Sequence, residues 1–306
     1  TDKTVSTDAD ACTYTHSGTD WNATATDGCA TIASLTYALT GATTVVSNPA
    51  NTSLSGVVFN KGITTVTWTA TDGSGNTATC SNTVTVGDTQ LPNAICKPVT
   101  IQLNASGNAS ITTADVNNNS SDNCGIQSMT VSTSAFTCAN LGPNTVTLTV
   151  TDLSGNISTC DATVTVQDLI DPVVVCSPIT VQLNSAGTYA LTAGNIAAMS
   201  AGSTDNCSIA TRTVLPNTFN CSDIGTAVNV ILTIADGSGR TASCPTTVTV
   251  EDNVPPTAIC KNITVQLNAL GSASITAADI NNGSNDACGI LSLVASKTTF
   301  TCADKG

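Results

Sequence analysis

The sequence predicts an all-β protein made of tandem antiparallel β-sandwich modules, and three observations lead to this fold class. The first is an internal repeat: residues 94–142 and 258–306 align without a gap and are identical at 30 of 49 positions. The second is a period-two alternation of apolar residues and threonine, which is typical of strands that bury one face. The third is a set of 14 regularly spaced cysteines, which indicates disulfide-stapled modules. Together they indicate an array of one repeated module.

Acidic, proline-containing segments recur between the repeats and mark the boundaries that we expect. These segments end at Pro92, Pro172 and Pro256. The last repeat ends before its expected closing strand and closing cysteine, so we expect the chain to be part of a longer protein. The predicted modules are a divergent one at 1–88, complete repeats at 89–168 and 169–252, and a truncated repeat at 253–306.

Strands are expected wherever apolar side chains alternate with threonine, because β-branched residues suit a half-buried pleated surface. The residues 113–116 are expected to form one helical turn, capped by Thr112 or Thr113. Short strands separated by glycine, asparagine and proline favour a sandwich of the immunoglobulin type. The stretches that we expect to contain strands are 34–41 and 59–86 in the first module, and 99–103, 145–151 and 162–166 in the second.

One core position can be followed through three modules. Trp68, Leu148 and Leu232 each lie four residues before the aspartate that opens a glycine-containing turn. We therefore expect all three side chains to be buried at equivalent places, and we interpret Trp68 as a core residue rather than a ligand platform.

The composition excludes several classes of function. The formal net charge is −13 and there are only eight lysines and arginines, so no cluster of cations is available to bind nucleic acid or an anionic membrane surface. No apolar run approaches the roughly 20 residues of a membrane span. The chain has one histidine, His16, so a hydrolase triad in each repeat is impossible, and no glycine-rich phosphate loop opens a helix. We therefore expect no enzymatic activity in this chain.

The cysteine spacing predicts disulfides within each module. Zinc binding is the rival interpretation, but it usually requires a close Cys-x₂₋₄-Cys pair, which is absent from the sequence. Cys29 and Cys260 are left without partners. The six expected disulfides are three outer pairs that join the first strand to the last (Cys12–Cys80, Cys96–Cys160, Cys176–Cys244) and three inner pairs with 14-residue spacing (Cys124–Cys138, Cys207–Cys221, Cys288–Cys302).

A turn with the pattern Asp-x-Ser-Gly-Asn or Asp-x-Ser-Gly-Arg recurs in three modules. It is explained as a tight hairpin turn in which aspartate bonds its own backbone. A second interpretation stays open, because such a turn would approach the acidic linker before its module, and carboxylates together with carbonyls suit Ca²⁺. A further acidic loop, residues 115–122, lacks the closing glutamate of a calcium loop and is interpreted as structural. The candidate Ca²⁺ ligands at the module junctions are Asp88, Asp152, Asp168, Asp171 and Asp236.

Residues 65–86 and 145–166, which contain the motif TATDGSGNTATC and its variant TVTDLSGNISTC, resemble the hyalin repeat (HYR) family of extracellular immunoglobulin-like modules. The repeated pattern AICK…VQLN…ITAADI…DACGI also resembles the tandem repeats of giant surface proteins of gliding Bacteroidota, the SprB-type gliding adhesins. That resemblance implies export by type IX secretion, display on the bacterial outer surface, and partners in the secretion and motility machinery. It implies no catalytic residues.

Two functions from different classes follow from the sequence. The first is a structural and adhesive segment of a long surface filament, whose partners are the neighbouring repeats and an external surface or glycan. The second is a carbohydrate- or protein-binding module of a secreted multidomain protein, which could carry an enzyme elsewhere. The first module is the better candidate for this second function, because it alone contains Trp21 and Trp68.

Overall fold

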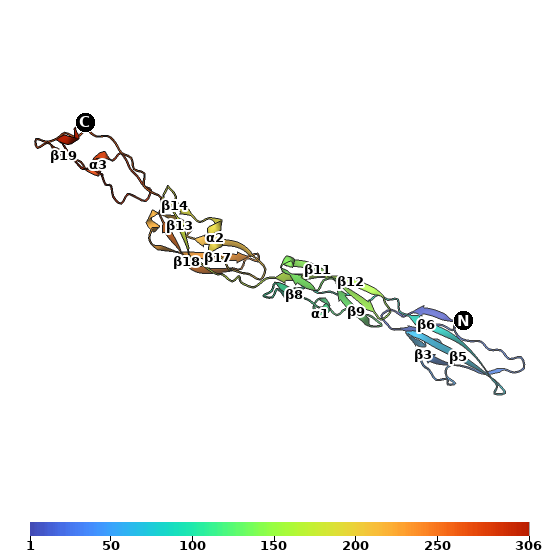
Figure 1. Cartoon of the computed structure of the whole chain (residues 1–306). Helices are drawn as coiled ribbons and strands as arrows, with labels where there is room; N and C mark the ends of the chain where they lie inside the picture. The colour runs from blue at the N-terminus through green and yellow to red at the C-terminus, as the bar shows by residue number, and fades with distance from the viewer. Residues whose placement is uncertain (306) are drawn as a thin grey trace. The chain divides into compact units, whose positions relative to one another are not determined.

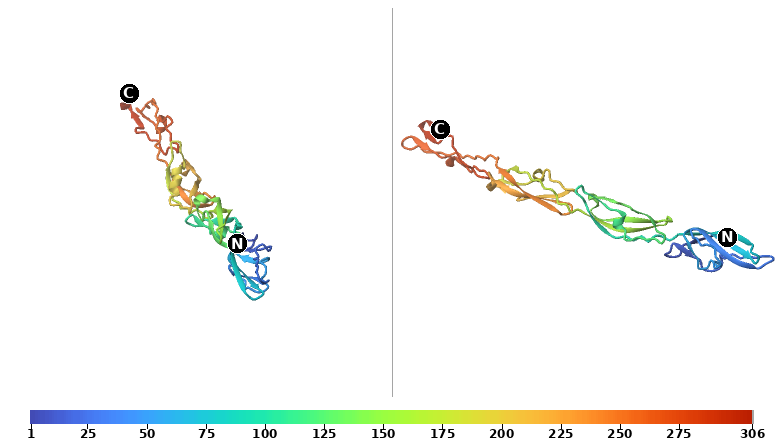
Figure 2. Two further views of the ribbon diagram at one scale, coloured as in Figure 1. Left: turned by 90° about the vertical axis from the view of Figure 1, so that its right-hand side faces the viewer. Right: turned by 90° about the horizontal axis from the view of Figure 1, so that it is seen from below.

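The computed structural model describes residues 1–305, and the chain divides into two compact units. The first unit contains residues 1–103 and 108–167, and the second contains residues 104–107 and the chain from Asp168 onward. Both units consist mainly of strands and turns, with a few very short helices (Figures 1 and 2). This confirms the all-β prediction. Gly306, the last residue of the fourth predicted module, lies outside the described residues.

The first unit contains two sandwiches, each made from a four-stranded and a two-stranded sheet. The strand orders are β1-β6-β5-β3 with β2-β4, and β7-β12-β11-β9 with β10-β8. The bounds of the first sandwich are β1 Lys3–Ser6, β2 Thr13–Thr15, β3 Ile32–Gly41, β4 Val58–Asn60, β5 Gly62–Asp72 and β6 Thr77–Gly87. Those of the second are β7 Val99–Gln102, β8 Asn108–Ser110, α1 Thr113–Val116, β9 Ile126–Val131, β10 Ala135–Thr137, the 3₁₀ helix η1 Cys138–Asn140, β11 Gly142–Asp152 and β12 Ile157–Gln167.

The second unit repeats this plan in a third sandwich, with the strand orders β13-β18-β17-β15 and β14-β16. A two-stranded sheet, β19-β20, follows it. The bounds are β13 Ile179–Gln182, β14 Thr188–Ala190, α2 Ala193–Met199, β15 Ile209–Leu215, β16 Thr218–Asn220, η2 Cys221–Asp223, β17 Ala227–Asp236, β18 Thr241–Glu251, β19 Ser272–Ser274, α3 Ala277–Ile280, β20 Thr299–Thr301 and η3 Cys302–Asp304.

One strand pair in each four-stranded sheet is parallel, which the antiparallel prediction did not include. The first strand of each sandwich lies beside the last strand and runs in the same direction, as in the pairs β1–β6, β7–β12 and β13–β18. Alternation reports which face of a strand is buried and not the direction of its neighbour. The sheets are therefore mixed, with antiparallel hairpins joined to one parallel edge strand.

The alternating residues of the long hairpins form the cores, as predicted. Val146, Leu148 and Val150 of β11 have no exposed surface. Trp68 and Leu232, the counterparts of Leu148, are 2% and 0% exposed, and each of the three lies directly opposite a cysteine of the next strand. The common core position predicted from the sequence is therefore confirmed.

The predicted helical turn at 113–116 forms α1. Thr112 precedes it in an extended conformation, and both its backbone N–H and its hydroxyl donate hydrogen bonds to Asp115 Oδ2, at 2.6 and 2.7 Å. These bonds hold the carboxylate in its charged form and lower the pKa of Asp115.

Candidate functional site

The linker that follows the first sandwich meets the hairpin turn of the second sandwich, as expected from the sequence. Ser154 Oγ donates a hydrogen bond of 2.9 Å to Asp88 Oδ2. The Asn156 amide donates to the carbonyl oxygens of Asp88 and Gln90, at 3.2 and 3.0 Å. Gln90 in turn donates to the carbonyl of Asp8 in the first sandwich at 2.7 Å. The turn, the linker and the preceding sandwich thus form one hydrogen-bonded junction.

The turn itself is organised by its aspartate. Asp152 Oδ1 accepts from the backbone N–H groups of Ser154 and Asn156 at 2.7 and 2.8 Å, and Oδ2 accepts from the Asn156 side chain at 2.7 Å. Gly155 adopts φ of 89°, a conformation that glycine enters without steric cost. Burial raises the pKa of Asp152, but the hydrogen bonds to Asn156, Ser154 and Gly155 outweigh burial, so its pKa is lowered overall.

Two groups of three carboxylates lie where the sequence predicted junction ligands. Within each group, one oxygen from every carboxylate lies within 4.8 Å of the others. A β-bulge next to the third aspartate of each group shifts the strand register there. The first group is Asp88, Asp122 and Asp152, and the second is Asp168, Asp205 and Asp236.

Asp122 and Asp205 were absent from the predicted set of junction ligands. Each begins an Asp-Asn-Cys sequence, and its Oδ2 accepts a hydrogen bond from the cysteine backbone N–H, at 2.7 Å for Cys124 and 2.8 Å for Cys207. The signal that could have found them is this Asp-x-Cys spacing, which also occurs in Asp286-Ala287-Cys288.

Asp171, one of the predicted ligands, lies outside the second group and has another partner. Arg240 Nε donates to Asp171 Oδ1 at 2.6 Å, and both side chains are partly exposed. Arg240 replaces the asparagine found in the other two turns. The Asp171 carboxylate is therefore already charge-compensated by a guanidinium.

Two of the predicted disulfides are present in the structure. Cys96 and Cys160 are bonded with their Cα atoms 5.8 Å apart, and Cys176 and Cys244 with their Cα atoms 6.2 Å apart. Each ties the segment before the first strand of a sandwich to its last strand. These outer pairs close the second and third sandwiches on themselves.

The other predicted pairs are corrected. Cys12 bonds Cys124 instead of the predicted Cys80. Cys221, predicted to bond Cys207, and Cys288, predicted to bond Cys302, bond each other. The inner pairs Cys124–Cys138, Cys207–Cys221 and Cys288–Cys302 therefore do not form, and neither does Cys12–Cys80. The cysteines that remain free and exposed are Cys29, Cys80, Cys260 and Cys302.

Strand length explains why an inner pair cannot close. Cys124 lies just before β9, which pairs with the Asp152 end of β11, whereas Cys138 lies just before the Gly142 end of the same strand. The strand is 11 residues long, so its two ends lie about 33 Å apart. A disulfide requires Cα atoms within about 7 Å of one another. Cys124 and Cys138 therefore lie at opposite ends of the second sandwich, and Cys124 reaches Cys12 of the first sandwich within the same unit.

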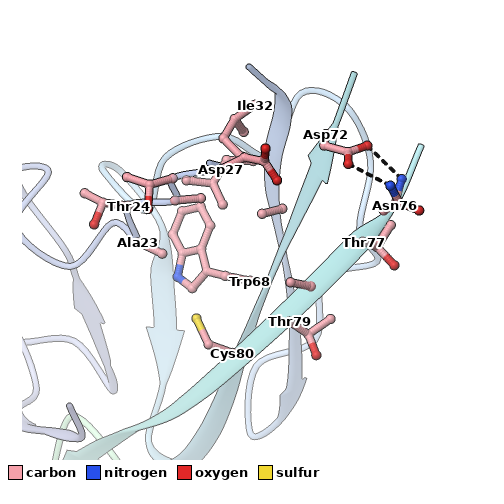
Figure 3. Close-up of a pocket in the computed structure, with 15 residues that line it drawn as sticks. Ala23, Thr24, Asp27, Ile32, Trp68, Asp72, Asn76, Thr77, Thr79 and Cys80 are labelled. Atoms are coloured by element: carbon pink, nitrogen blue, oxygen red, sulfur yellow. Dashed lines mark hydrogen bonds between the residues drawn. The ribbon is translucent and has the colours of Figure 1, made fainter. Parts of the chain in front are cut away.

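A cavity of about 390 Å³ opens on the first sandwich (Figure 3). Trp68 contributes its indole beside Ala23 and Thr24, and the free Cys80 lies next to it. The Asp72–Asn76 hydrogen bonds mark the turn at its rim. The hydrogen bonds from Asn76, followed by those from Ser74 and Gly75, lower the pKa of Asp72.

Trp21 is half-buried and packed against other rings. Its ring stacks on His16 with centroids 3.9 Å apart, and His16 is 2% exposed. Tyr14 stacks on the same tryptophan at 5.6 Å. These residues extend the core of the first sandwich, which fits a structural role for the single histidine.

None of the helices within residues 1–305 is long and apolar enough to cross a membrane.

Part of the sequence is similar to a known domain family and to one curated protein. A model of the HYR domain matches residues 36–86. Hyalin of Strongylocentrotus purpuratus is 32% identical over 246 residues, which make up 74% of this chain and 20% of hyalin. The chain thus spans about a fifth of the length of this curated relative. The two findings support a HYR-type repeat in this chain.

Solved structures show more distant likenesses. Protocadherin Gamma B2 extracellular cadherin domains 1–5 share 15% identity, with 90% of this chain and 68% of that chain covered and a TM-score of 0.32. The I-band fragment I67–I69 of titin shares 10% identity, with 82% and 95% covered and a TM-score of 0.31. Likenesses this distant say nothing about function.

Proposed function

We propose that this chain is a structural and adhesive segment of a long, repetitive extracellular protein whose successive repeats are joined by disulfide bonds. The observation that carries the proposal is the Cys12–Cys124 bond, which links two cysteines 112 residues apart in different sandwiches of the first unit. A binding domain that acts alone needs no covalent bond to its neighbour. A chain that bears tension between two surfaces gains from such a bond.

The second unit supports the same principle. Cys221, at the start of η2, bonds Cys288, which lies beyond the closing strand β18 of the third sandwich. The bond crosses from one predicted repeat into the next. We propose that the repeat is the building block of the array, with bounds at 1–88, 89–168, 169–252 and 253–306. The acidic linkers and the recurring strand order support these bounds.

The HYR-type repeat and the disulfides support an extracellular location. We further propose display on the outer surface of a gliding bacterium, with export by type IX secretion and transport by a surface motor. The support for this finer statement is the resemblance of the repeats to those of the giant surface adhesins. The external target is a surface or a glycan.

The test is to label the protein on live cells that produce it, with an antibody raised against residues 88–252. Labels that travel along the cell surface would support a motor-driven adhesin. Static surface labels would limit the function to a passive stalk or adhesin. Labels found only in the medium would contradict display on the cell surface.

One observation favours a second candidate function, the binding of a small ligand such as a glycan. The cavity on the first sandwich is lined by Asp27 and Asp72, and concave sites with a few polar groups bind small molecules. Glycan-array binding by the whole chain, lost on substitution Asp27→Ala, would support this function. Equal binding by both proteins would contradict a site in this cavity.

A further inference from the structure

The carboxylates of Asp168, Asp205 and Asp236 converge from three separate segments of the second unit. Asp168 lies in the linker before β13, Asp205 in the loop between α2 and β15, and Asp236 at the end of β17. One oxygen from each lies within 4.8 Å of the other two. Three like charges at this separation repel one another strongly unless something of opposite charge lies between them.

Each of these carboxylates uses one oxygen to hold the local backbone and leaves the other buried without a donor. Asp236 Oδ1 accepts from two turn N–H groups at 2.8 Å, and Asp205 Oδ2 accepts from two loop N–H groups at 2.8 and 2.9 Å. Asp168 Oδ1 accepts from the N–H of Ile170 at 3.1 Å. Asp168 Oδ2, Asp205 Oδ1 and Asp236 Oδ2 are buried and have no hydrogen-bond partner.

Because these three oxygens are buried, water cannot readily serve as their hydrogen-bond partner. Asp168 is 3% exposed and Asp236 is 4% exposed. A buried, charged oxygen without a hydrogen bond is strongly unfavourable, and native proteins resolve it with a partner or a metal ion. Within residues 1–305 no lysine or arginine forms an ion pair with any of the three carboxylates, because the neighbouring guanidinium of Arg240 pairs with Asp171.

We infer that Asp168, Asp205 and Asp236 form a binding site for one Ca²⁺ ion. Two oxygens bound to the same Ca²⁺ at about 2.4 Å lie no more than about 4.8 Å apart, and the oxygens of this group satisfy that limit. Mg²⁺ binds at about 2.0–2.1 Å and demands a tighter octahedron, and Zn²⁺ favours nitrogen and sulfur ligands. Water molecules would complete the six to eight oxygens that Ca²⁺ takes.

The equivalent group in the first unit has only one buried oxygen without a partner, compared with three in the second unit. Asp88 Oδ2 accepts from Ser154 Oγ and lies 3.9 Å from the ammonium of Lys61. Asp152 Oδ2 accepts from the side chain of Asn156. Of the buried oxygens in this group, only Asp122 Oδ1 is without a partner. At this site the ammonium of Lys61 and the side-chain amide of Asn156 thus compensate the carboxylates. At Asp168, Asp205 and Asp236 we infer that Ca²⁺ does so.

A third group, Asp252, Asp286 and Cys288, provides only two carboxylates. The sulfur of Cys288 is bonded to Cys221 and cannot act as a thiolate ligand. One strong site per chain is therefore expected from the described residues.

The test is calorimetric titration of the 306-residue chain with CaCl₂ after treatment with a chelator. The wild-type protein should bind one Ca²⁺ ion per chain and unfold at a higher temperature when Ca²⁺ is present. Asp205→Asn keeps an oxygen to accept the loop N–H groups but removes the charge, so it should weaken binding at least tenfold. Asp168→Asn provides a second variant with the same expected loss.

The matched control is Asp122→Asn, which makes the same change in the first group. It should bind Ca²⁺ as the wild type does, and circular dichroism should show that all variants are folded. No calcium binding by the wild type up to about 10 mM, beyond the range of weak extracellular sites, would overturn the inference. So would equal affinities of the wild type, Asp205→Asn and Asp168→Asn, or a loss of binding on Asp122→Asn as large as that on Asp205→Asn.

Discussion

The two acidic groups occupy the same positions of the repeat but differ in what surrounds them. In the first unit, Lys61, Ser154 and Asn156 all contact the group of Asp88, Asp122 and Asp152. In the second unit, Arg240 replaces the asparagine and turns to Asp171, so the buried carboxylates keep unpartnered oxygens. The first junction is thus held by the protein's own hydrogen bonds and a lysine, whereas we infer that the second needs a cation.

The covalent link should give the largest effect at the first junction. The double substitution Cys12→Ser and Cys124→Ser removes the disulfide that closes a loop of 112 residues. On the chain-entropy model, closing a loop of this length stabilises the folded protein by about 4–5 kcal/mol. We expect a clear fall in the unfolding temperature, measured by calorimetry. Cys80→Ser removes an exposed free thiol and serves as the control, with an expected change within about 0.5 kcal/mol. Equal unfolding temperatures for the double variant and the control would contradict a stabilising link.

Removing the Asn156 side chain should have the next largest effect. Asn156→Ala deletes hydrogen bonds to Asp152 and to the linker carbonyls of Asp88 and Gln90, so we expect a loss of about 1–3 kcal/mol in urea unfolding. Asn76→Ala is the matched control, because the Asn76 side chain bonds only Asp72 within its own turn. A loss from Asn76→Ala as large as that from Asn156→Ala would show that the linker contacts contribute nothing.

Acid should weaken the turn of the second sandwich. The pKa of Asp152 is lowered on folding, so its stabilising contribution is present above the ordinary aspartate pKa of 3.8 and disappears as the pH falls through the lower folded-state value. We expect the unfolding temperature to fall below about pH 4, and to fall less steeply in Asp152→Asn. The measurement is thermal unfolding by circular dichroism between pH 2 and pH 7. Parallel curves for the two proteins would count against this assignment.

The smallest effect is expected from Arg240→Ala. The Arg240–Asp171 pair is 37% and 59% exposed, and exposed ion pairs contribute about 0–1 kcal/mol, less at high salt. Chemical denaturation at low and high ionic strength would measure this effect. A loss well above that range, unchanged by salt, would mean that Arg240 stabilises the turn by packing rather than by its charge.

The sequence was sufficient to predict the long hairpin strands and the core because both depend on local alternation. The burial of Trp68, Leu148 and Leu232 followed from one recurring spacing. The parallel pairing of the edge strands β1, β7 and β13 was not predicted, since alternation carries no information about the direction of a neighbour.

The junctions were predicted only in part, for a related reason. The 14-residue spacing of the inner cysteines is the same whether they bond within a module or between modules, and only the length of β11 decides between these arrangements. Asp122 and Asp205 come from loops that reach the linker only after folding, so sequence spacing alone did not associate them with Asp88 and Asp168.

Disulfide mapping of the unreduced protein by mass spectrometry tests the central claim, the covalent joining of successive repeats, most directly. The protein is alkylated without reduction, digested and analysed for cross-linked peptides. The account predicts peptides that join Cys12 to Cys124 and Cys221 to Cys288, with Cys80 and Cys302 alkylated. Peptides that join Cys12 to Cys80, Cys124 to Cys138 or Cys288 to Cys302 would contradict it, because each repeat would then be closed on itself.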